Sequence, residues 1–209
     1  MTATADVDTR RRQVAEALLE VVAEQGLAGA KLVTVAERAG ISVGLVQHHF
    51  RSKSQLLRFA VEHLCRRAEE RIDEIRAVRP LRVALYRLAE SLLPLDDERR
   101  NEAAVWASFL PLTLTDGDLA ALHRGAVDHQ LTGFERVVAA AQTLDELPDH
   151  LDAALEARQL TAFLDGLANY MLTCPDVYDA AASRHMLQTY LDRLFTDGGD
   201  RSAGPREER

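Results

Sequence analysis

Apolar residues recur along this chain at the three- and four-residue spacing of α-helices. Val14, Leu18 and Val22 show the pattern, and Gly26 follows where a helix is expected to stop. No segment has the alternation of a β-strand bounded by turns. The spacing predicts an all-α fold of about nine helices, with three short ones before residue 51 and others over about 53–77, 81–93, 98–114, 116–143, 149–173 and 177–195.

The segment 33–57 predicts two short helices joined by a tight turn, directly before a third helix. Gly40 can adopt the positive φ that a sharp turn between helices requires. Ser42 is suited to cap the second helix, on which Val46 and Phe50 point inward. This arrangement is typical of a helix-turn-helix, which presents a few polar side chains of a small rigid helix to DNA.

The outward face of the second helix carries polar and small residues. Gly44 costs roughly 1 kcal/mol of helix stability relative to alanine, which indicates that another molecule approaches closely there. The amide of Gln47 suits base edges such as adenine. His48 and His49 can contact phosphate or a base, although His49 is equally compatible with a packed core histidine.

Phosphate-binding candidates flank this helix. Lys53 begins the next helix, where its charge opposes the helix dipole, and contact with a phosphate would explain its position. Thr34 lies at the start of the preceding helix, where a hydroxyl and backbone N–H groups can bind phosphate. The basic run 10–12 is either a DNA-binding arm or a solvated cluster.

The chain of 209 residues has a formal net charge of −8, which by itself argues against a nucleic-acid binder. Residues 1–60 hold eight Lys or Arg and six Asp or Glu, whereas residues 61–209 hold 17 and 27. The N-terminal part is therefore the basic end of an acidic protein. Because phosphate contact depends on local charge, DNA binding at this end remains compatible with the total.

Other classes of protein are disfavoured. No apolar run approaches the ~20 residues of a membrane helix, and the start MTATADVDTRRR is not a signal peptide. Cys65 and Cys174 lie far apart, which favours two buried thiols in a reduced, cytoplasmic setting. Without H-E-x-x-H, G-x-S-x-G, a Gly-rich phosphate loop or a Cys/His cluster, we expect no enzyme, cofactor or metal site. An all-α enzyme or interaction module without DNA binding is the alternative.

Residues 39–53, AGISVGLVQHHFRSK, resemble the N-terminal signature A-G-[IV]-S-x-G-x-[LIV]-x-x-[HY]-F-x-x-K of the TetR family of bacterial transcription regulators. The resemblance covers about residues 10–60. Residues 92–124 also look like the regulatory domain of the choline-responsive, betaine-operon branch. The resemblance implies a repressor that a small molecule releases from a palindromic DNA operator.

By position, the resemblance also implies the DNA contacts. Lys31 stands where many family members have Thr or Ser, so the hydroxyl cap of the first helix of the motif is missing here. The implied DNA-binding residues are Lys31, Thr34, Ser42, Val43, Gly44, Gln47, His48, His49 and Lys53.

The resemblance places a ligand pocket among the helices of residues 81–173. Trp106 and Phe109 lie one turn apart there, and Trp106 with Glu102 could form one wall of a cage for a cationic ligand. An apolar ligand is equally compatible, and each aromatic residue could instead belong to the core. The candidate ligand-binding residues are Tyr86, Glu102, Trp106, Phe109, Leu110, Phe163 and Tyr170.

The last two long helices, about 149–173 and 177–195, are expected to pair with their copies in a homodimer. Small residues such as Ala162 and Gly166 allow close helix contact, and the final helix has a broad apolar stripe around Leu187 and Leu191. The expected organisation is a disordered tail over 1–9, a helix-turn-helix domain over 10–57, a regulatory and dimerisation domain over 58–196, and a disordered tail over 197–209.

Overall fold

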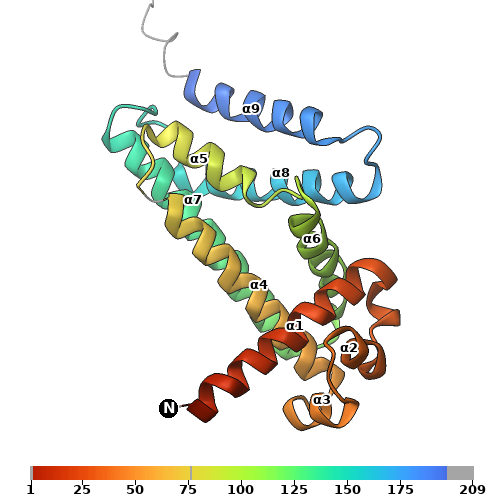
Figure 1. Ribbon diagram of the computed structural model, residues 1–209. Coiled ribbons are helices and arrows are strands. Elements are labelled where there is room, and N and C mark those ends of the chain that lie inside the picture. The colour runs from red at the N-terminus through yellow and green to blue at the C-terminus, as the bar shows by residue number, and fades with distance from the viewer. Residues whose placement is uncertain (1, 76, 197–209) are drawn as a thin grey trace, which may run out of the picture. The chain divides into compact units, whose positions relative to one another are not determined.

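The computed structural model describes residues 2–75 and 77–196, and this part contains nine α-helices, one 3-10 helix and no strand (Figure 1). The predicted all-α class is therefore confirmed. The helices are α1 (Thr2–Gly29), α2 (Leu32–Arg38), α3 (Val43–His49), α4 (Lys53–Ile75), α5 (Leu81–Glu90), α6 (Asp97–Phe109), η1 (Leu110–Leu114), α7 (Gly117–Thr143), α8 (Ala153–Thr173) and α9 (Ala180–Thr196).

Short-range capping signals in the sequence correspond to hydrogen bonds in the structure. The hydroxyl of Ser42 accepts from the N–H of Leu45 at 3.2 Å, as predicted. Ser52 accepts from the N–H of Gln55 at 3.1 Å, while the Gln55 side chain reaches back to the N–H of Arg51 at 2.8 Å. These bonds satisfy N–H groups that the first turn of a helix leaves unpaired, so α3 and α4 begin where the sequence indicates.

The start of α1 and the end of α6 differ from the predictions. Residues 2–9, predicted as a disordered tail, form the first part of α1, and this stretch has no Gly or Pro that would disfavour a helix. Gly26, with φ 67°, interrupts α1 near its predicted stop. Helix α6 ends at Phe109 because Pro111 lacks the N–H that an α-helix needs, and η1 follows. The predicted tail 197–209 lies outside the described residues.

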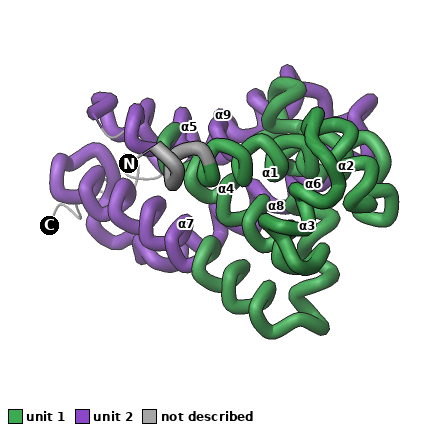
Figure 2. Tube along the Cα trace, turned by 60° about the horizontal axis from the view of Figure 1, so that its bottom comes forward, with its two compact units in different colours: residues 1–71, 93–127 green, residues 72–92, 128–209 purple. Residues whose placement is uncertain are grey.

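The chain forms two compact units, drawn in different colours in Figure 2. The first comprises residues up to 71 together with 93–127, and the second comprises 72–92 together with residues from 128 onward. The first unit is larger than the predicted helix-turn-helix domain, because Val105 and Phe109 of α6 are fully buried in the same core as Val14 and Leu18 of α1. Helix α6 is thus part of the core that supports α1 to α3.

In the second unit, α9 packs against α5 and α8. Leu187 and Leu191 from the predicted apolar stripe of α9 are buried in this packing, whereas Met186 is 38% exposed. Arg184 of α9 forms an ion pair with Glu90 of α5 at 2.7 Å. Part of the stripe therefore serves packing within one chain. Among the described helices, none is both long and apolar enough to cross a membrane.

Candidate nucleic-acid interface

The turn between α2 and α3 has the geometry that the sequence predicts. Gly40 follows the end of α2 with φ 65°, a conformation that side chains rarely adopt. The N–H of Ile41 then donates to the carbonyl of Ala36 at 3.0 Å and closes the turn. On α3, Val46 and Phe50 are fully buried. Helix α3 is therefore anchored to the core of the first unit by Val46 and by Phe50 at its C-terminal end.

The outer face of α3 is open. Gly44, Gln47 and His48 are exposed, and Ser42 is exposed at the helix start. A Cβ atom built on Gly44 would meet nothing within 4 Å, so no packing contact in the chain requires glycine there. Val43 differs from the prediction, because it is partly buried against the core instead of pointing fully outward.

The flanking phosphate-binding candidates have different environments. Lys31 is the exposed N-cap of α2 and makes no side-chain cap hydrogen bond, in agreement with the missing hydroxyl. Thr34 is partly buried in the first turn of α2. Lys53 donates from Nζ to the carbonyl of Leu27 at 2.6 Å, so it ties the start of α4 to the end of α1. No short-range pattern in the sequence indicates this contact, which spans 26 positions.

His49 is partly buried beside the part of α1 that carries Arg10 and Arg11. Burial lowers the pKa of the imidazole most, and the charges of His48, Arg11 and Arg10 lower that pKa further. The guanidinium of Arg11 lies over the rings of Phe59 and Phe50, at 4.4 and 5.4 Å from their centroids. Arg11 is therefore not merely solvated, which was one of the two alternatives that the sequence left open for the run 10–12.

Not every basic residue near α3 has a charge available to DNA. Arg38 is held by Glu20 and Glu24 of α1, with N–O distances of 3.0 and 2.9 Å, so its charge is largely neutralised. Arg51 is exposed directly after α3. It was not among the predicted contacts, although its place between Phe50 and Lys53 is a signal that could have included it.

The first unit holds four of the predicted ligand-binding residues. Trp106 and Phe109 are neighbours with ring centroids 5.5 Å apart, and His123 of α7 lies 5.6 Å from Trp106. Phe109 is fully buried and Leu110 is 37% exposed. His123, whose Nδ1 is buried without a partner among the described residues, is a candidate that the sequence did not single out.

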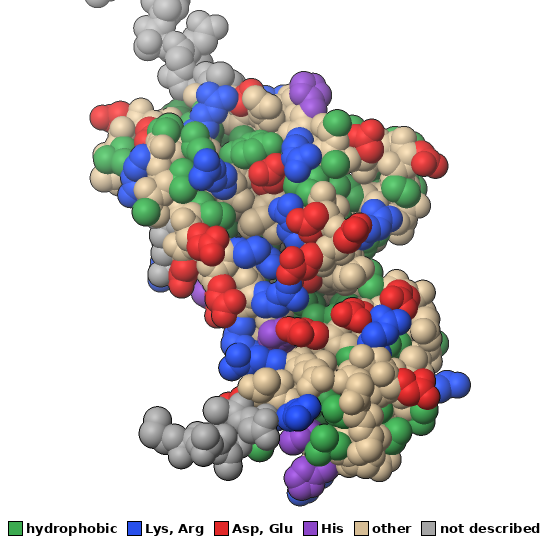
Figure 3. All heavy atoms as spheres, in the orientation of Figure 1, with side chains coloured by type: hydrophobic (Ala, Val, Ile, Leu, Met, Phe, Trp, Pro, Cys, Tyr) green, Lys and Arg blue, Asp and Glu red, His purple; other side chains and the backbone are tan. Residues whose placement is uncertain are grey.

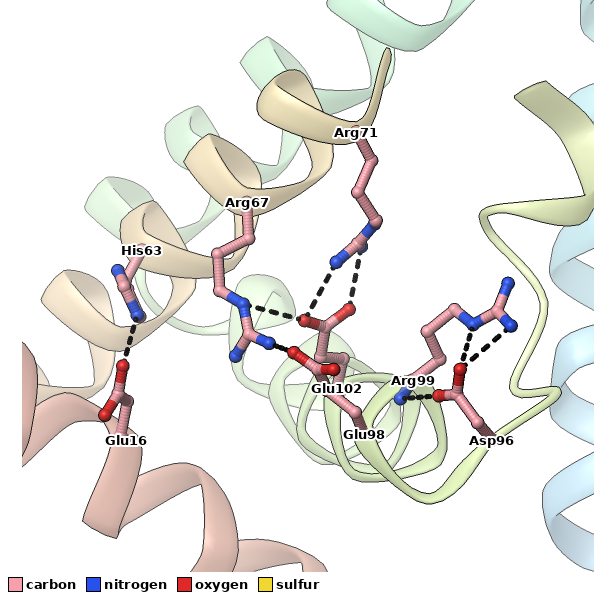
Figure 4. A network of polar contacts seen from close by, with 8 residues as sticks. All are labelled: Glu16, His63, Arg67, Arg71, Asp96, Glu98, Arg99 and Glu102. Atoms are coloured by element: carbon pink, nitrogen blue, oxygen red, sulfur yellow. Dashed lines mark hydrogen bonds and ion pairs between the residues drawn. The ribbon is translucent and has the colours of Figure 1, made fainter. Parts of the chain in front are cut away.

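Glu102, predicted to form one wall of a ligand cage, is already paired with two arginines in this structure. Figure 4 shows Arg67 and Arg71 of α4 pointing toward it. The Glu102 carboxylate forms ion pairs with Arg71 Nη2 at 2.8 Å and with Arg67 Nε at 3.3 Å. The Glu102 side chain is only 12% exposed. A carboxylate that already binds two guanidinium groups is a poor partner for a further cation. The cage wall of Trp106 and Glu102 is therefore not supported by the geometry.

The second unit holds the other three ligand-binding candidates. Phe163 stacks on Tyr190 at 4.7 Å, and Tyr170, which is 48% exposed, stacks on Tyr178 at 4.8 Å. Tyr86 is partly buried, and burial, followed by the charge of Glu90, raises the pKa of its phenol. Phe163 and Tyr170 thus each have an aromatic partner within their own unit.

A polar cleft of about 710 Å³ lies between α1, α4 and α6 in the first unit. Charged side chains line it, including Arg12, Glu70 and the buried His63, whose Nε2 lies 3.6 Å from Glu16 (Figure 4). This lining does not suit an apolar ligand. Within the described residues, no three His, Cys, Asp or Glu side chains are placed to hold a metal ion.

The two thiols also differ. Cys65 is partly buried in α4, and burial raises the pKa of its thiol to about 11. Cys174 is exposed at the end of α8, so the prediction that it is buried in a helix is wrong. The reason is that Cys174 ends α8 with non-helical backbone angles, directly before Pro175.

Comparison with known proteins agrees with this geometry. Residues 14–59 match the bacterial regulatory proteins of the tetR family, and residues 81–196 match the C-terminal domain of BetI-type transcriptional repressors. The chain is 31% identical over 195 residues to the HTH-type transcriptional regulator PksA of Bacillus subtilis, covering 92% of this chain and 93% of that protein. It is 31% identical over 187 residues to BetI of Stenotrophomonas maltophilia, covering 88% and 91%.

Solved structures have the same fold. A transcriptional regulator from Rhodococcus superposes with a TM-score of 0.79 at 33% identity, over 88% of this chain and 95% of that one. A regulator from Saccharomonospora viridis, solved in complex with choline, superposes with a TM-score of 0.82 at 24% identity, over 88% and 96%. With its helix-turn-helix and a C-terminal part of BetI type, the chain belongs to the tetR family of bacterial regulatory proteins.

Proposed function

We propose that this protein is a transcriptional repressor that binds a palindromic DNA operator in the cytoplasm and is released from it by a small molecule. The observation that carries the proposal is the construction of α3. Val46 and Phe50 anchor the helix because their side chains are buried in the core. The opposite face is exposed and carries Gly44, Gln47 and His48. A short helix held this way fits the major groove with its polar side chains toward the bases.

Nine residues are proposed to contact DNA, in two classes. Those on the outer face of α3 face the bases, and those at helix starts or flanks bind backbone phosphates. Ser42 already caps α3, so its contact with DNA would use the second lone pair of its hydroxyl or the nearby backbone. The base-facing set is Val43, Gly44, Gln47 and His48, and the phosphate-binding set is Lys31, Thr34, Ser42, His49 and Lys53.

We propose that α8 and α9 form the dimer interface. Leu155, Ala162 and Asn169 are seven residues apart on α8 and all exposed, so they form one stripe along the helix. Leu155 of α8 is 45% exposed and Met186 of α9 is 38% exposed. Apolar and small residues on the surface of two adjacent helices favour pairing with a second copy. Two copies related by a two-fold axis would read a palindrome.

The effector is proposed to be a small organic molecule. Choline is the first cation to test, since the chain matches the BetI type and the Saccharomonospora viridis regulator binds choline. Because Glu102 is neutralised by Arg67 and Arg71, a bound cation would need another counter-charge or an aromatic surface such as Trp106. A medium-chain alcohol, which carries no charge, is the apolar ligand to compare.

The test is fluorescence anisotropy with a labelled duplex that the protein enriches from a random pool. We expect tight, salt-dependent binding to the enriched duplex and at least 1,000-fold weaker binding to a scrambled duplex, roughly the usual specificity ratio. One of the two ligand classes should release the DNA. Equal affinity for both duplexes would favour the alternative of an interaction module or enzyme that does not bind DNA.

A further inference from the structure

The side chain of Arg11 packs α1 against Phe50, the residue that ends α3. Its guanidinium lies 4.4 Å from the centroid of Phe59 and 5.4 Å from that of Phe50, and the two rings are 5.4 Å apart. Phe50 ends α3 and is fully buried, so Arg11 cannot move away without losing contact with that core. This packing holds the basic run of α1 beside the last residues of α3.

The consequence is a cluster of cationic groups around His49. The rings of His48 and His49 lie 5.4 Å apart. Besides burial, the influences that lower the pKa of His49 are His48 on its own helix and Arg11 and Arg10 on α1. All of these are cationic or become so when protonated. Histidine and basic side chains can be seen together over α3 at the lower end of Figure 3.

Such a cluster is unfavourable in the free protein and favourable beside an anion. Like charges held near one another disfavour protonation of the imidazole. A phosphodiester placed among them reverses the sign of the interaction, because its negative charge stabilises the protonated ring and the guanidinium together. The gain is realised only in the complex with DNA.

We infer that one DNA backbone phosphate binds between the part of α1 that carries Arg10 and the end of α3, held by Arg10 and by His49 in its protonated form, so that DNA binding takes up a proton at His49. This inference rests on the proposed function. It adds a phosphate ligand from α1 and a pH dependence to the DNA-binding site.

The sign of the effect follows from linkage. Since the complex holds more protons than its separate parts, DNA affinity rises as pH falls. The rise begins near the pKa of His49 in the complex and levels off below its depressed pKa in the free protein. Uptake of one full proton by a protomer would make the DNA affinity of that protomer rise tenfold for each unit by which the pH falls.

The experiment measures proton uptake directly. Calorimetric titration of the full-length protein with the enriched duplex is carried out at about pH 7 in buffers of different ionisation enthalpy. We expect uptake of a substantial fraction of one proton per protomer, and roughly tenfold tighter binding at about pH 6 than at about pH 7.5. His49→Gln should abolish the uptake, while His150→Gln, at an exposed histidine of the second unit that has no proposed DNA contact, should retain it.

A second pair of variants tests the phosphate ligand. Arg10→Gln should weaken DNA binding and lower the salt slope by about one per protomer. Arg12→Gln is the matched control, since Arg12 is also exposed on α1 but lines the polar cleft. We expect Arg12→Gln to leave the slope close to that of the unmodified protein.

The outcomes separate this inference from the proposed function. Specific DNA binding without proton uptake, or with uptake that survives His49→Gln, overturns the inference alone. Absence of specific binding at every pH overturns the proposed function and the inference with it. If His49→Gln does not fold, the imidazole resonances of His49 in the unmodified protein decide: an unchanged pKa on adding the duplex contradicts the proposal.

Discussion

Gly44 weakens its own helix and has no role in the packing of the chain. It is exposed, and a side chain at its position would meet nothing within 4 Å. Gly40 is different, because its φ of 65° makes glycine necessary for the turn. Sequence reasoning already assigned the turn to Gly40 and an exposed position to Gly44, and the positive φ of Gly40 and the open space beside Gly44 agree with that assignment.

Gly44→Ala should therefore stabilise the protein while weakening its binding to DNA. The free energy of unfolding should rise by about 0.5–1 kcal/mol, and affinity for the enriched duplex should fall at least tenfold because the methyl group obstructs the groove. Gly125→Ala on α7 is the control, because Gly125 is also exposed with nothing within 4 Å. Urea unfolding and anisotropy measure both variants, and equal DNA affinity for the two would contradict the interpretation of Gly44.

Lys53 combines a structural contact with a proposed phosphate contact. Lys53→Ala should lower the free energy of unfolding by about 1 kcal/mol through loss of the bond to the Leu27 carbonyl. It should also lower the salt slope of DNA binding by about one per protomer. Lys31→Ala, which removes no side-chain cap hydrogen bond, should change the slope without changing stability. An unchanged slope for Lys53→Ala would remove Lys53 from the phosphate contacts.

At the scale of the helices, short-range signals were sufficient for most starts and insufficient for α8. Ser42 and Ser52 cap helices through residues three positions away, a distance that sequence patterns capture. Pro148 and Asp149 also look like a helix start, yet α8 begins at Ala153. The side chain of Gln142 explains the delay, because it donates to the carbonyls of Pro148 and Leu151, both at 2.9 Å, and so stabilises a turn there.

The start of α8 can be tested with two aspartates. Asp152 accepts from the N–H groups of Ala154 and Leu155, so Asp152→Ala should cost about 1 kcal/mol of stability. Asp149→Ala should cost less than about 0.3 kcal/mol, because Asp149 is an exposed residue outside the helix. Urea unfolding of both variants measures the difference. A larger cost for Asp149→Ala would place the helix start where the sequence first indicated.

On the scale of the molecule, the sequence predicted the class of fold but not the extent of the first unit. Val105 and Phe109 belong to the core of α1 to α3, although more than 80 residues separate them from Val14 and Leu18. Periodicity shows that a face is apolar but not which distant face covers it. For the same reason, the ion pairs of Glu102 with Arg67 and Arg71 could not be foreseen, and the predicted cation cage was placed on an occupied carboxylate.

The proposed dimer is tested by a charge at the centre of the exposed stripe of α8. Ala162→Glu should shift the protein to a monomer in sedimentation at micromolar concentration, because two copies of the new carboxylate would meet near the two-fold axis. Affinity for the operator should fall roughly 100-fold or more, because a monomer binds only one half-site. Ala140→Glu, at an exposed alanine of α7, should remain dimeric. A dimeric Ala162→Glu would move the interface away from this stripe.

The most direct test is selection of binding sites from a random duplex pool by the unmodified protein and by Gln47→Ala in parallel. We expect both proteins to enrich a palindrome with half-sites reached by the two α3 helices. Gln47→Ala should lose discrimination of roughly 1–3 kcal/mol at one base pair in each half-site and keep the others. The proposed DNA recognition would be contradicted if neither protein enriched a two-fold symmetric sequence. It would also be contradicted if both proteins had identical base preferences at every position.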